Sequence, residues 1–262
     1  MADAGGWATR INVPGLATLG ALVAAWEGLV RSGAVDFAFL PAPSGVADAL
    51  WSLVSSGDLL PELVHTLRSA VVGWALASVL GVALGVWLGL SDRAWRYSMA
   101  SIEVLRAIPP ISLVPVALLV FGFSLKMELT LIVYVGAWTV LVNTIDGVRS
   151  VRSELVDVAR MLRMPRLTTI RKVVLPAATP SIVVGLRLAL SLSLVLAVVA
   201  EMIGNPRGLG NALVRAQQAL QPEQMFAYVV TIGVLGIVLN TALRFASAWA
   251  LPGLAAGRTD ES

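Results

Sequence analysis

The sequence predicts an all-α integral membrane protein with six transmembrane helices, built as a single domain over residues 1–262. Hydrophobic residues make up 57% of the chain and charged residues 13%, whereas about a quarter of the residues in a soluble domain are charged. The mean hydropathy is +0.83, and the apolar residues are gathered in long runs. Because these runs lack the alternation of membrane strands, we expect helices surrounded by lipid.

Six apolar stretches are long enough to cross a bilayer, which takes about 20 mostly apolar residues in a helix. They are Val13 to Val30, Leu63 to Leu90, Ile102 to Phe123, Glu128 to Ile145, Ala178 to Ala200 and Phe226 to Leu251. The first also contains a signal-peptide-like core, Leu16 to Ala25. Only Arg10 precedes it and further spans follow, so an uncleaved first helix is favoured.

Basic residues are concentrated in two of the loops between these stretches. The loop after the second stretch contains Arg93 and Arg96. The loop after the fourth contains Arg149, Arg152, Arg160, Arg163, Arg166, Arg171 and Lys172. Since cytoplasmic loops carry an excess of Lys and Arg, the sequence predicts that both loops and both termini lie in the cytoplasm.

Two of the stretches carry residues that affect helix packing. Gly81, Gly85 and Gly89 recur every four residues and clear one face of the second stretch for another backbone. In the third stretch, Pro109, Pro110 and Pro115 remove backbone donors. A broken membrane helix needs protein or a water-filled cavity around it. We therefore expect the break to line a pathway, with an ordinary kink as the alternative.

Turn signals occupy the two longer loops on the opposite side. Pro41 to Ser44 breaks the chain, and Ser44 is expected to cap a short helix that runs to Leu53. Gly204 to Gly210 is a second strong breaker run.

The segment from residue 147 to 177 is too regular to be a simple connection. Ser153 is a good N-cap, and Pro165 ends the first helix and can occupy the first turn of a second, which Pro176 closes. The apolar faces are Leu155, Val158, Ala159 and Leu162 in the first helix, and Leu167, Ile170, Val173 and Val174 in the second. Such helices either lie on anionic lipid or dock in a groove of a soluble partner, and periodicity does not separate the two.

The order of residues in this segment resembles the "EAA" loop of ABC importer permeases, which has a Glu-Ala-Ala triplet, a later Gly and an apolar-apolar-Leu-Pro close. The matching stretches here are Asp157 to Arg163 and Val173 to Pro176. The likeness extends to Pro41 to Ser44, Arg106 to Pro110, Asn143 and Thr144 with Gly147 to Arg149, Gly185 to Ala189, and Ala200 to Gly204 followed by Gly208 to Gly210. It favours the nitrate, sulfonate and taurine branch.

This resemblance implies a MetI-like type I importer fold, with cytoplasmic coupling helices, in the plasma membrane of a bacterium. Two permease copies, here expected as a homodimer, would form the pathway, two cytoplasmic ATPases would drive it, and an external binding protein would deliver the solute. ATP and Mg²⁺ would be bound by the ATPases, and no cofactor by this chain. The ATPase contact would fall on Asp157, Val158, Ala159, Leu162, Arg163, Met164 and Pro165.

Arg163 departs from the family pattern, because it stands where Gly is usual. Glycine there would let the chain turn between the two short helices. We expect either that the turn is shifted toward Pro165 or that Arg163 pairs with an acid on the ATPase.

The composition excludes several other functions. The chain has no cysteine and one histidine, His65, so thiolate chemistry and any constellation that needs two histidines are excluded. No metal site and no catalytic residue are expected, and His65 is expected at the membrane interface. The net charge of +3 is explained by membrane topology rather than by a nucleic-acid partner.

The polar residues within the stretches are candidates for the pathway and its gate. They are Ser112, Asn143, Ser191 and Glu201, in addition to Pro109 and Pro110. Glu201, at the outward end of the fifth stretch, is expected to shape an external gate. A Ser in a membrane helix more often bonds its own backbone.

The expected function is therefore a permease subunit of an ATP-driven importer for a small solute, with an anion such as an alkanesulfonate, taurine or nitrate favoured. The main alternative is a secondary transporter or channel that works without ATP. Such a carrier would normally bury paired ionisable groups at mid-membrane and would gain nothing from a docking loop.

Overall fold

The computed structural model describes residues 13–34, 37 and 39–250, and they form helices without any strand. The helices are α1 (Val13–Arg31), α2 (Pro43–Ser56), α3 (Leu59–Gly89), α4 (Asp92–Arg106), η1 (Pro110–Leu113), α5 (Val114–Phe121), α6 (Leu125–Arg149), α7 (Ser153–Met161), α8 (Arg166–Thr169), η2 (Ile170–Val174), α9 (Leu175–Gly204), α10 (Leu209–Gln218) and α11 (Pro222–Ala250). The predicted all-α fold is confirmed. Arg10 and the end of the expected sixth span, Leu251, lie outside the described residues.

Four helical segments within these residues are long and apolar enough to cross a membrane, or five if one bent pair counts as a single span. They are Leu59–Gly89, Leu125–Arg149, Arg166–Gly204 and Pro222–Trp249, with Asp92–Arg106 and Pro110–Phe121 as the bent pair. The first expected span coincides with α1, which is not among them. The total of six spans therefore remains a prediction.

The third expected span, Ile102 to Phe123, is not one straight helix. The two arms of this segment, α4 and η1–α5, meet at an angle of 78°. Pro109 has an extended backbone and precedes the 3₁₀ turn that starts at Pro110. Neither proline has a backbone N–H to continue the α4 ladder, which accounts for the break. The predicted interruption of the third span is therefore confirmed.

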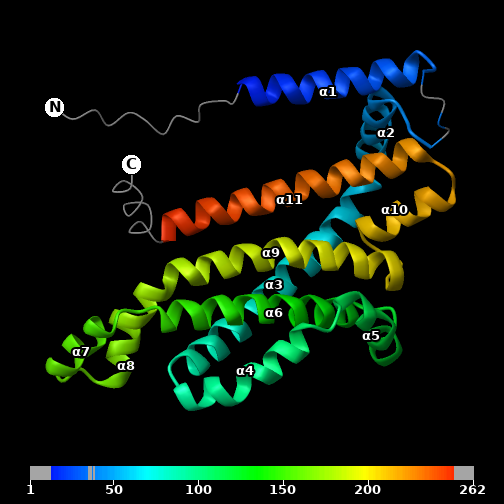
Figure 1. Cartoon of the computed structure of the whole chain (residues 1–262). Helices are drawn as coiled ribbons and strands as arrows, with labels where there is room; N and C mark the ends of the chain where they lie inside the picture. Colours follow the sequence, from blue (N-terminus) through cyan, green and yellow to red (C-terminus); the bar gives the residue numbers. More distant parts are fainter. Residues whose placement is uncertain (1–12, 35–36, 38, 251–262) are drawn as a thin grey trace, which may run out of the picture.

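The core of the fold is the packing of α3, α6 and α9 against one another, with α11 along the far side of α9 (Figure 1). Where α3 meets α6, a Cβ added to Gly81 would lie 2.6 Å from Val140 Cβ, and one added to Gly85 would lie 2.6 Å from Thr144 Cβ. Only glycine allows this approach, so the packing role predicted for the glycine stripe is confirmed.

The two ends of this bundle are built differently. Figure 1 shows α7 and α8 at one end, and α2, α5 and α10 at the other. At the second end Glu27 of α1 accepts hydrogen bonds from the backbone N and the Oγ of Ser44, at 3.0 and 2.8 Å. The N-cap of α2 is Ala42, so the expectation that Ser44 caps it is wrong. Pro43 starts the helix one residue earlier, and a carboxylate from α1 satisfies the free N–H instead.

Candidate functional site

The loop from residue 147 to 177 forms two short helices, as predicted, with small shifts at their ends. The N-cap of α7 is Arg152, so Ser153 is the first helical residue rather than the cap, and no side chain caps this helix. Pro165 is the N-cap of α8. The extended conformation of Pro165 sets the direction in which the second helix leaves the turn.

Arg163 makes the turn between α7 and α8. Its φ of 51° lies in the left-handed region. The backbone N–H of Arg163 bonds the carbonyl of Arg160 at 2.9 Å, and that of Met164 bonds the carbonyl of Ala159 at 3.0 Å. This is the pair of bonds of a Schellman motif, whose left-handed position is usually glycine. The expectation that the turn shifts away from Arg163 is therefore wrong, because these two bonds hold an unfavourable backbone in place.

The apolar face predicted for the first helix is divided in the structure. Ala159 is buried, and α7 packs against η2. Val158 and Leu162 are 52% and 69% exposed, and Met161 is 82% exposed. Leu155 is also exposed. The chain itself therefore leaves an apolar surface uncovered on α7, and we call Leu155, Val158, Met161 and Leu162 the α7 surface.

The polar members of the predicted contact lie beside this surface. Asp157 pairs with Arg160 on the same helix, with 3.2 Å between Oδ1 and Nη1, and both side chains are exposed. Arg163 and Pro165 are exposed as well, while Met164 is half-buried. An exposed ion pair between residues three apart contributes little stability, so it leaves Asp157 available to a partner.

The sequence predicted that the second short helix ends at Pro176, and this prediction is wrong. α8, η2 and α9 run on as one helical segment of 39 residues, Arg166–Gly204. The five residues Ile170–Val174 form a π-helix just before Pro176. A proline ring clashes with the carbonyl four residues earlier in a regular α-helix, and the wider π turn relieves that crowding. The loop is thus joined to the apolar span without a break.

A groove of about 740 Å³ separates the loop from the neighbouring ends of α4 and α6. Arg149 lines it, pairs with Asp92 at 2.9 Å and lies 4.2 Å from the centre of the Trp95 ring. Arg160 and Arg166 line the same groove. Arg149 therefore fixes the start of α4 against the end of α6, while the loop side of the groove stays basic.

The opposite end of the bundle contains a buried polar cluster around Glu201. The Glu201 side chain is fully buried, and its Oε2 accepts hydrogen bonds from Thr66 Oγ1 at 2.9 Å and from the Gly210 N–H at 3.0 Å. The carboxylate thus joins α9 to α3 and to the first turn of α10, where free N–H groups favour a negative charge. Glu62 at the rim bonds the Gly208 N–H and Arg215 Nη2, both at 2.6 Å.

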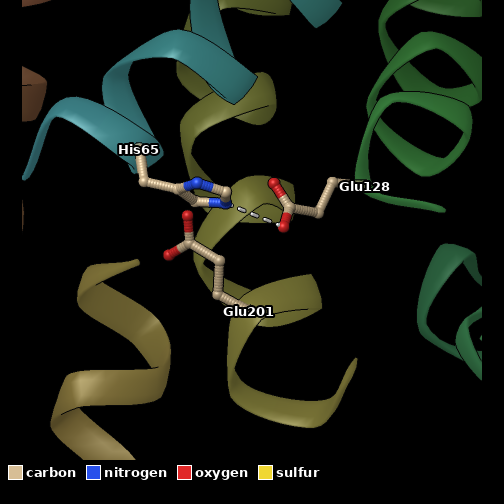
Figure 2. Close-up of side chains that lie close together, drawn as sticks. All are labelled: His65, Glu128 and Glu201. Carbon is tan, nitrogen blue, oxygen red and sulfur yellow. Dashed lines mark hydrogen bonds and ion pairs between the residues drawn. The ribbon is translucent and has the colours of Figure 1, made fainter. Parts of the chain in front are cut away.

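His65 and Glu128 complete this cluster, and the sequence analysis missed both. His65 Nε2 lies 3.2 Å from Glu128 Oε1 (Figure 2), and the fully buried Glu128 also accepts a hydrogen bond from Asn205 Nδ2. The His65 side chain is only 18% exposed, and its expected place at the membrane interface remains a prediction. One signal in the sequence could have indicated them. Both residues lie within two turns of the end of an expected span, and the predicted topology places those ends on the same side of the membrane as Glu201.

The other polar pathway candidates, Ser112, Asn143 and Ser191, form hydrogen bonds outside the cluster around Glu201. Ser112 Oγ bonds the Pro109 carbonyl at 2.7 Å, and Asn143 Nδ2 bonds the Thr139 carbonyl of its own helix at 2.8 Å. Ser191 Oγ lies 3.2 Å from Asn240 Oδ1 and so links α9 to α11. These groups do not share the polar contacts of Glu201.

The apolar part of α9 also carries a cationic side chain, that of Arg187. Arg187 has a buried Nε without a hydrogen-bond partner, and it forms no ion pair with any other residue that the structure describes. A charged group within a membrane span is costly and usually marks a pathway or a ligand.

Comparison with known proteins agrees with this architecture. The chain is 32% identical over 239 residues to an aliphatic sulfonates transport permease of Bacillus subtilis (strain 168), a match that covers 91% of this chain and 85% of the relative. It is 29% identical to a nitrate import permease of Leptolyngbya laminosa, covering 80% and 78%. The membrane chain of the inward-facing MetNI methionine ABC transporter shares the fold, with a TM-score of 0.61, 18% identity, and coverage of 74% of this chain and 95% of that one.

The family described as the binding-protein-dependent transport system inner membrane component matches residues 78–255, which include the loop from residue 147 to 177. That match covers more than half of the chain and runs from the second half of α3 through α11. The chain therefore belongs to this family, and it is a multi-pass permease subunit of an ABC importer.

Proposed function

We propose that this permease carries a small anion, with an alkanesulfonate, taurine or nitrate as its class of solute, and that residues 147–177 couple it to cytoplasmic ATPases. The observation that carries the proposal is the α7 surface at the end of an unbroken helical segment. Each Leu or Met that a partner buries fully contributes about 1.5–3 kcal/mol, so four such side chains suffice to anchor a docked helix.

The position of the α7 surface favours protein docking over contact with lipid. Figure 1 shows α7 at one end of the bundle, and Met161 and Leu162 at the end of this helix precede the turn at Arg163. An apolar surface at the end of the bundle is suited to a groove of a soluble partner.

The continuous helical connection between the loop and α9 would allow movement of the loop to reach the membrane span. Because Arg166–Gly204 is one segment, a displacement of α8 moves the whole of α9, whose far end holds Glu201. When ATP binding closes the two ATPases, the resulting movement of the loop would thereby be transmitted along α9 to the polar cluster. Glu201 then acts as part of an outward gate, since it joins α9 to α3 and α10.

The solute class follows from the relatives and from Arg187. The two relatives described above are named for aliphatic sulfonates and for nitrate, both anions. The Nε of Arg187 lies buried on α9 without a hydrogen-bond partner. A guanidinium that carries no counterion of its own is suited to bind a planar or tetrahedral anion in transit.

The proposed assembly contains two copies of this chain, two ATPases and an external binding protein. The permease would be non-catalytic, with ATP and Mg²⁺ held by the ATPases. Both termini and the loops around Arg93 and Arg160 would face the cytoplasm of a bacterium, because these loops carry the basic residues.

Reconstitution in liposomes tests this function against a carrier that works without ATP. Purified permease, ATPase and binding protein are combined, and uptake of radiolabelled taurine and nitrate is measured with ATP, with an ion gradient, or with neither. Uptake that requires ATP and the ATPase supports the proposal. Uptake driven by an ion gradient in vesicles without the ATPase would instead establish a secondary transporter.

A further inference from the structure

Three potential metal ligands from three helices converge at the end of the bundle away from the coupling loop. They are His65 on α3, Glu128 on α6 and Glu201 on α9, whose side chains point toward one another in Figure 2. One ligand atom from each lies within 4.8 Å of the other two. Such convergence from residues far apart in the sequence is set by the fold and not by local geometry.

The charges in this cluster do not balance. Glu128 and Glu201 are both fully buried. His65 is the sole partner in an ion pair with Glu128, and no ion pair with Glu201 occurs in residues 13–34, 37 and 39–250. Even a protonated imidazole neutralises only one of two buried carboxylates. Burying an unpaired charge is strongly unfavourable, so a carboxylate in this cluster either takes up a proton or binds a cation.

Each carboxylate has one oxygen held in place and one oxygen without a partner. Glu201 Oε2 is fixed by Thr66 and by the backbone of Gly210, whereas its Oε1 is buried without a hydrogen bond. Glu128 Oε1 is fixed by His65 and Asn205, whereas its Oε2 is likewise buried and unpartnered. Metal-binding carboxylates are typically oriented in this way, with one oxygen held by the surrounding protein.

We propose that His65, Glu128 and Glu201 bind one divalent transition-metal ion, with Zn²⁺ preferred. Imidazole nitrogen and carboxylate oxygen are both ligands of Zn²⁺, and with three protein ligands water takes the fourth position. Ligand atoms at about 2.0–2.2 Å from a tetrahedral zinc stand roughly 3.3–3.6 Å apart. One ligand atom from each of the three residues lies within 4.8 Å of the others, so an ion held at that spacing would need only small adjustments of these side chains, and the unpartnered Glu128 Oε2 and Glu201 Oε1 are available to bind it.

An ion can reach the cluster from outside the bundle. A groove of about 340 Å³ is lined by the His65 ring and by Glu62. Arg68 and Arg207 line it as well, so its charge does not attract cations. Affinity for the ion must therefore come from the three ligands themselves, which makes substitutions of the ligands decisive.

Metal binding is tested on the full-length chain in lipid nanodiscs, purified with a tag free of histidine and treated with EDTA. Zn²⁺ is titrated calorimetrically and Co²⁺ by visible absorption. We expect one ion per chain. Removing an outer contact of a metal site typically costs 10–100-fold in affinity, so His65→Ala, Glu128→Gln and Glu201→Gln should each weaken binding about 100-fold or more. Glu103→Gln, at an exposed carboxylate on α4, is the matched control and should bind as the wild type does.

The single histidine allows a test that needs no variant. With His65 the sole imidazole and no cysteine present, the ¹⁵N resonance of Nε2 must shift when Zn²⁺ is added. Absence of saturable binding by the wild-type chain, or wild-type affinity in His65→Ala, would overturn the proposal. If a variant fails to fold, the ¹⁵N measurement decides alone. None of these readouts depends on transport, so the result is independent of the importer function.

Discussion

The backbone N–H of Met164 donates to the Ala159 carbonyl at 3.0 Å and closes the turn between α7 and α8. Between them Arg163 adopts a left-handed backbone, with φ of 51°. A non-glycine residue in this conformation costs roughly 1–2 kcal/mol. The loop keeps the turn geometry associated with glycine, although the sequence does not have glycine there.

Arg163→Gly is therefore expected to stabilise the chain. Relief of the left-handed strain exceeds the added backbone entropy of glycine, and the net gain should be about 0.5–1 kcal/mol. Thermal unfolding in detergent measures it. Arg160→Gly, within α7, is the matched control and should destabilise by about 1 kcal/mol. A lower melting temperature for Arg163→Gly than for the wild type would contradict this interpretation of the turn.

The contact between α10 and α9 makes a second prediction, at Gly210. A Cβ on Gly210 would lie 2.2 Å from the Val198 carbonyl oxygen and 3.0 Å from Glu201 Cβ. Gly210→Ala should therefore destabilise the chain by about 1–3 kcal/mol. Gly233→Ala on α11 has open space around its Cβ and should be neutral or stabilising, by up to about 1 kcal/mol. Equal effects of the two substitutions on the melting temperature would refute the close approach of α10 to α9.

Orientation provides a third prediction, which uses the absence of native cysteine. Met161→Cys on α7 and Gln217→Cys on α10 place single thiols at exposed positions at opposite ends of the bundle. An impermeant maleimide added to intact cells should label only Gln217→Cys, and inverted vesicles stripped of the ATPase, which would otherwise cover Met161, should show the reverse. Labelling of Met161→Cys in intact cells would place the loop from residue 147 to 177 outside the cell and contradict the predicted topology.

Arg187 is expected to determine affinity for the anionic solute. Loss of one charge-assisted contact costs about 1.5–3 kcal/mol, so Arg187→Gln should lower ATP-driven anion uptake roughly 10–150-fold at limiting solute. Binding of the ATPase should be unchanged, because Arg187 lies away from the loop. Arg244→Gln, an exposed cation on α11, serves as the control. Uptake by Arg187→Gln at the wild-type rate would exclude Arg187 from the pathway.

The elements that composition and periodicity predicted were those governed by local physics. Apolar length predicted the helices, the glycine stripe predicted the α3–α6 contact, and Pro109 and Pro110 predicted the break after α4. Each of these features acts through its own helix or its immediate neighbour.

The features that were missed depend on contacts between distant residues. Glu27 caps α2 from another helix, so the role assigned to Ser44 was wrong. Glu128 and His65 are 63 positions apart and meet only when α3 and α6 pack, and a single histidine carries no metal-binding pattern in sequence. Pro176 continues a helix because a π turn precedes it, and that turn has no recognisable sequence signal.

The central claim is that the α7 surface transmits force from the ATPase to the membrane span. Leu162→Asp places a charge in the proposed contact, whereas Arg160→Ala removes one exposed charge that contributes at most about 1 kcal/mol. The most direct measurement is ATP-driven uptake together with ATPase co-purification for both variants. We predict that Leu162→Asp loses both ATP-driven uptake and co-purification with the ATPase, while Arg160→Ala keeps most of each. Wild-type uptake and ATPase binding by Leu162→Asp would contradict the account.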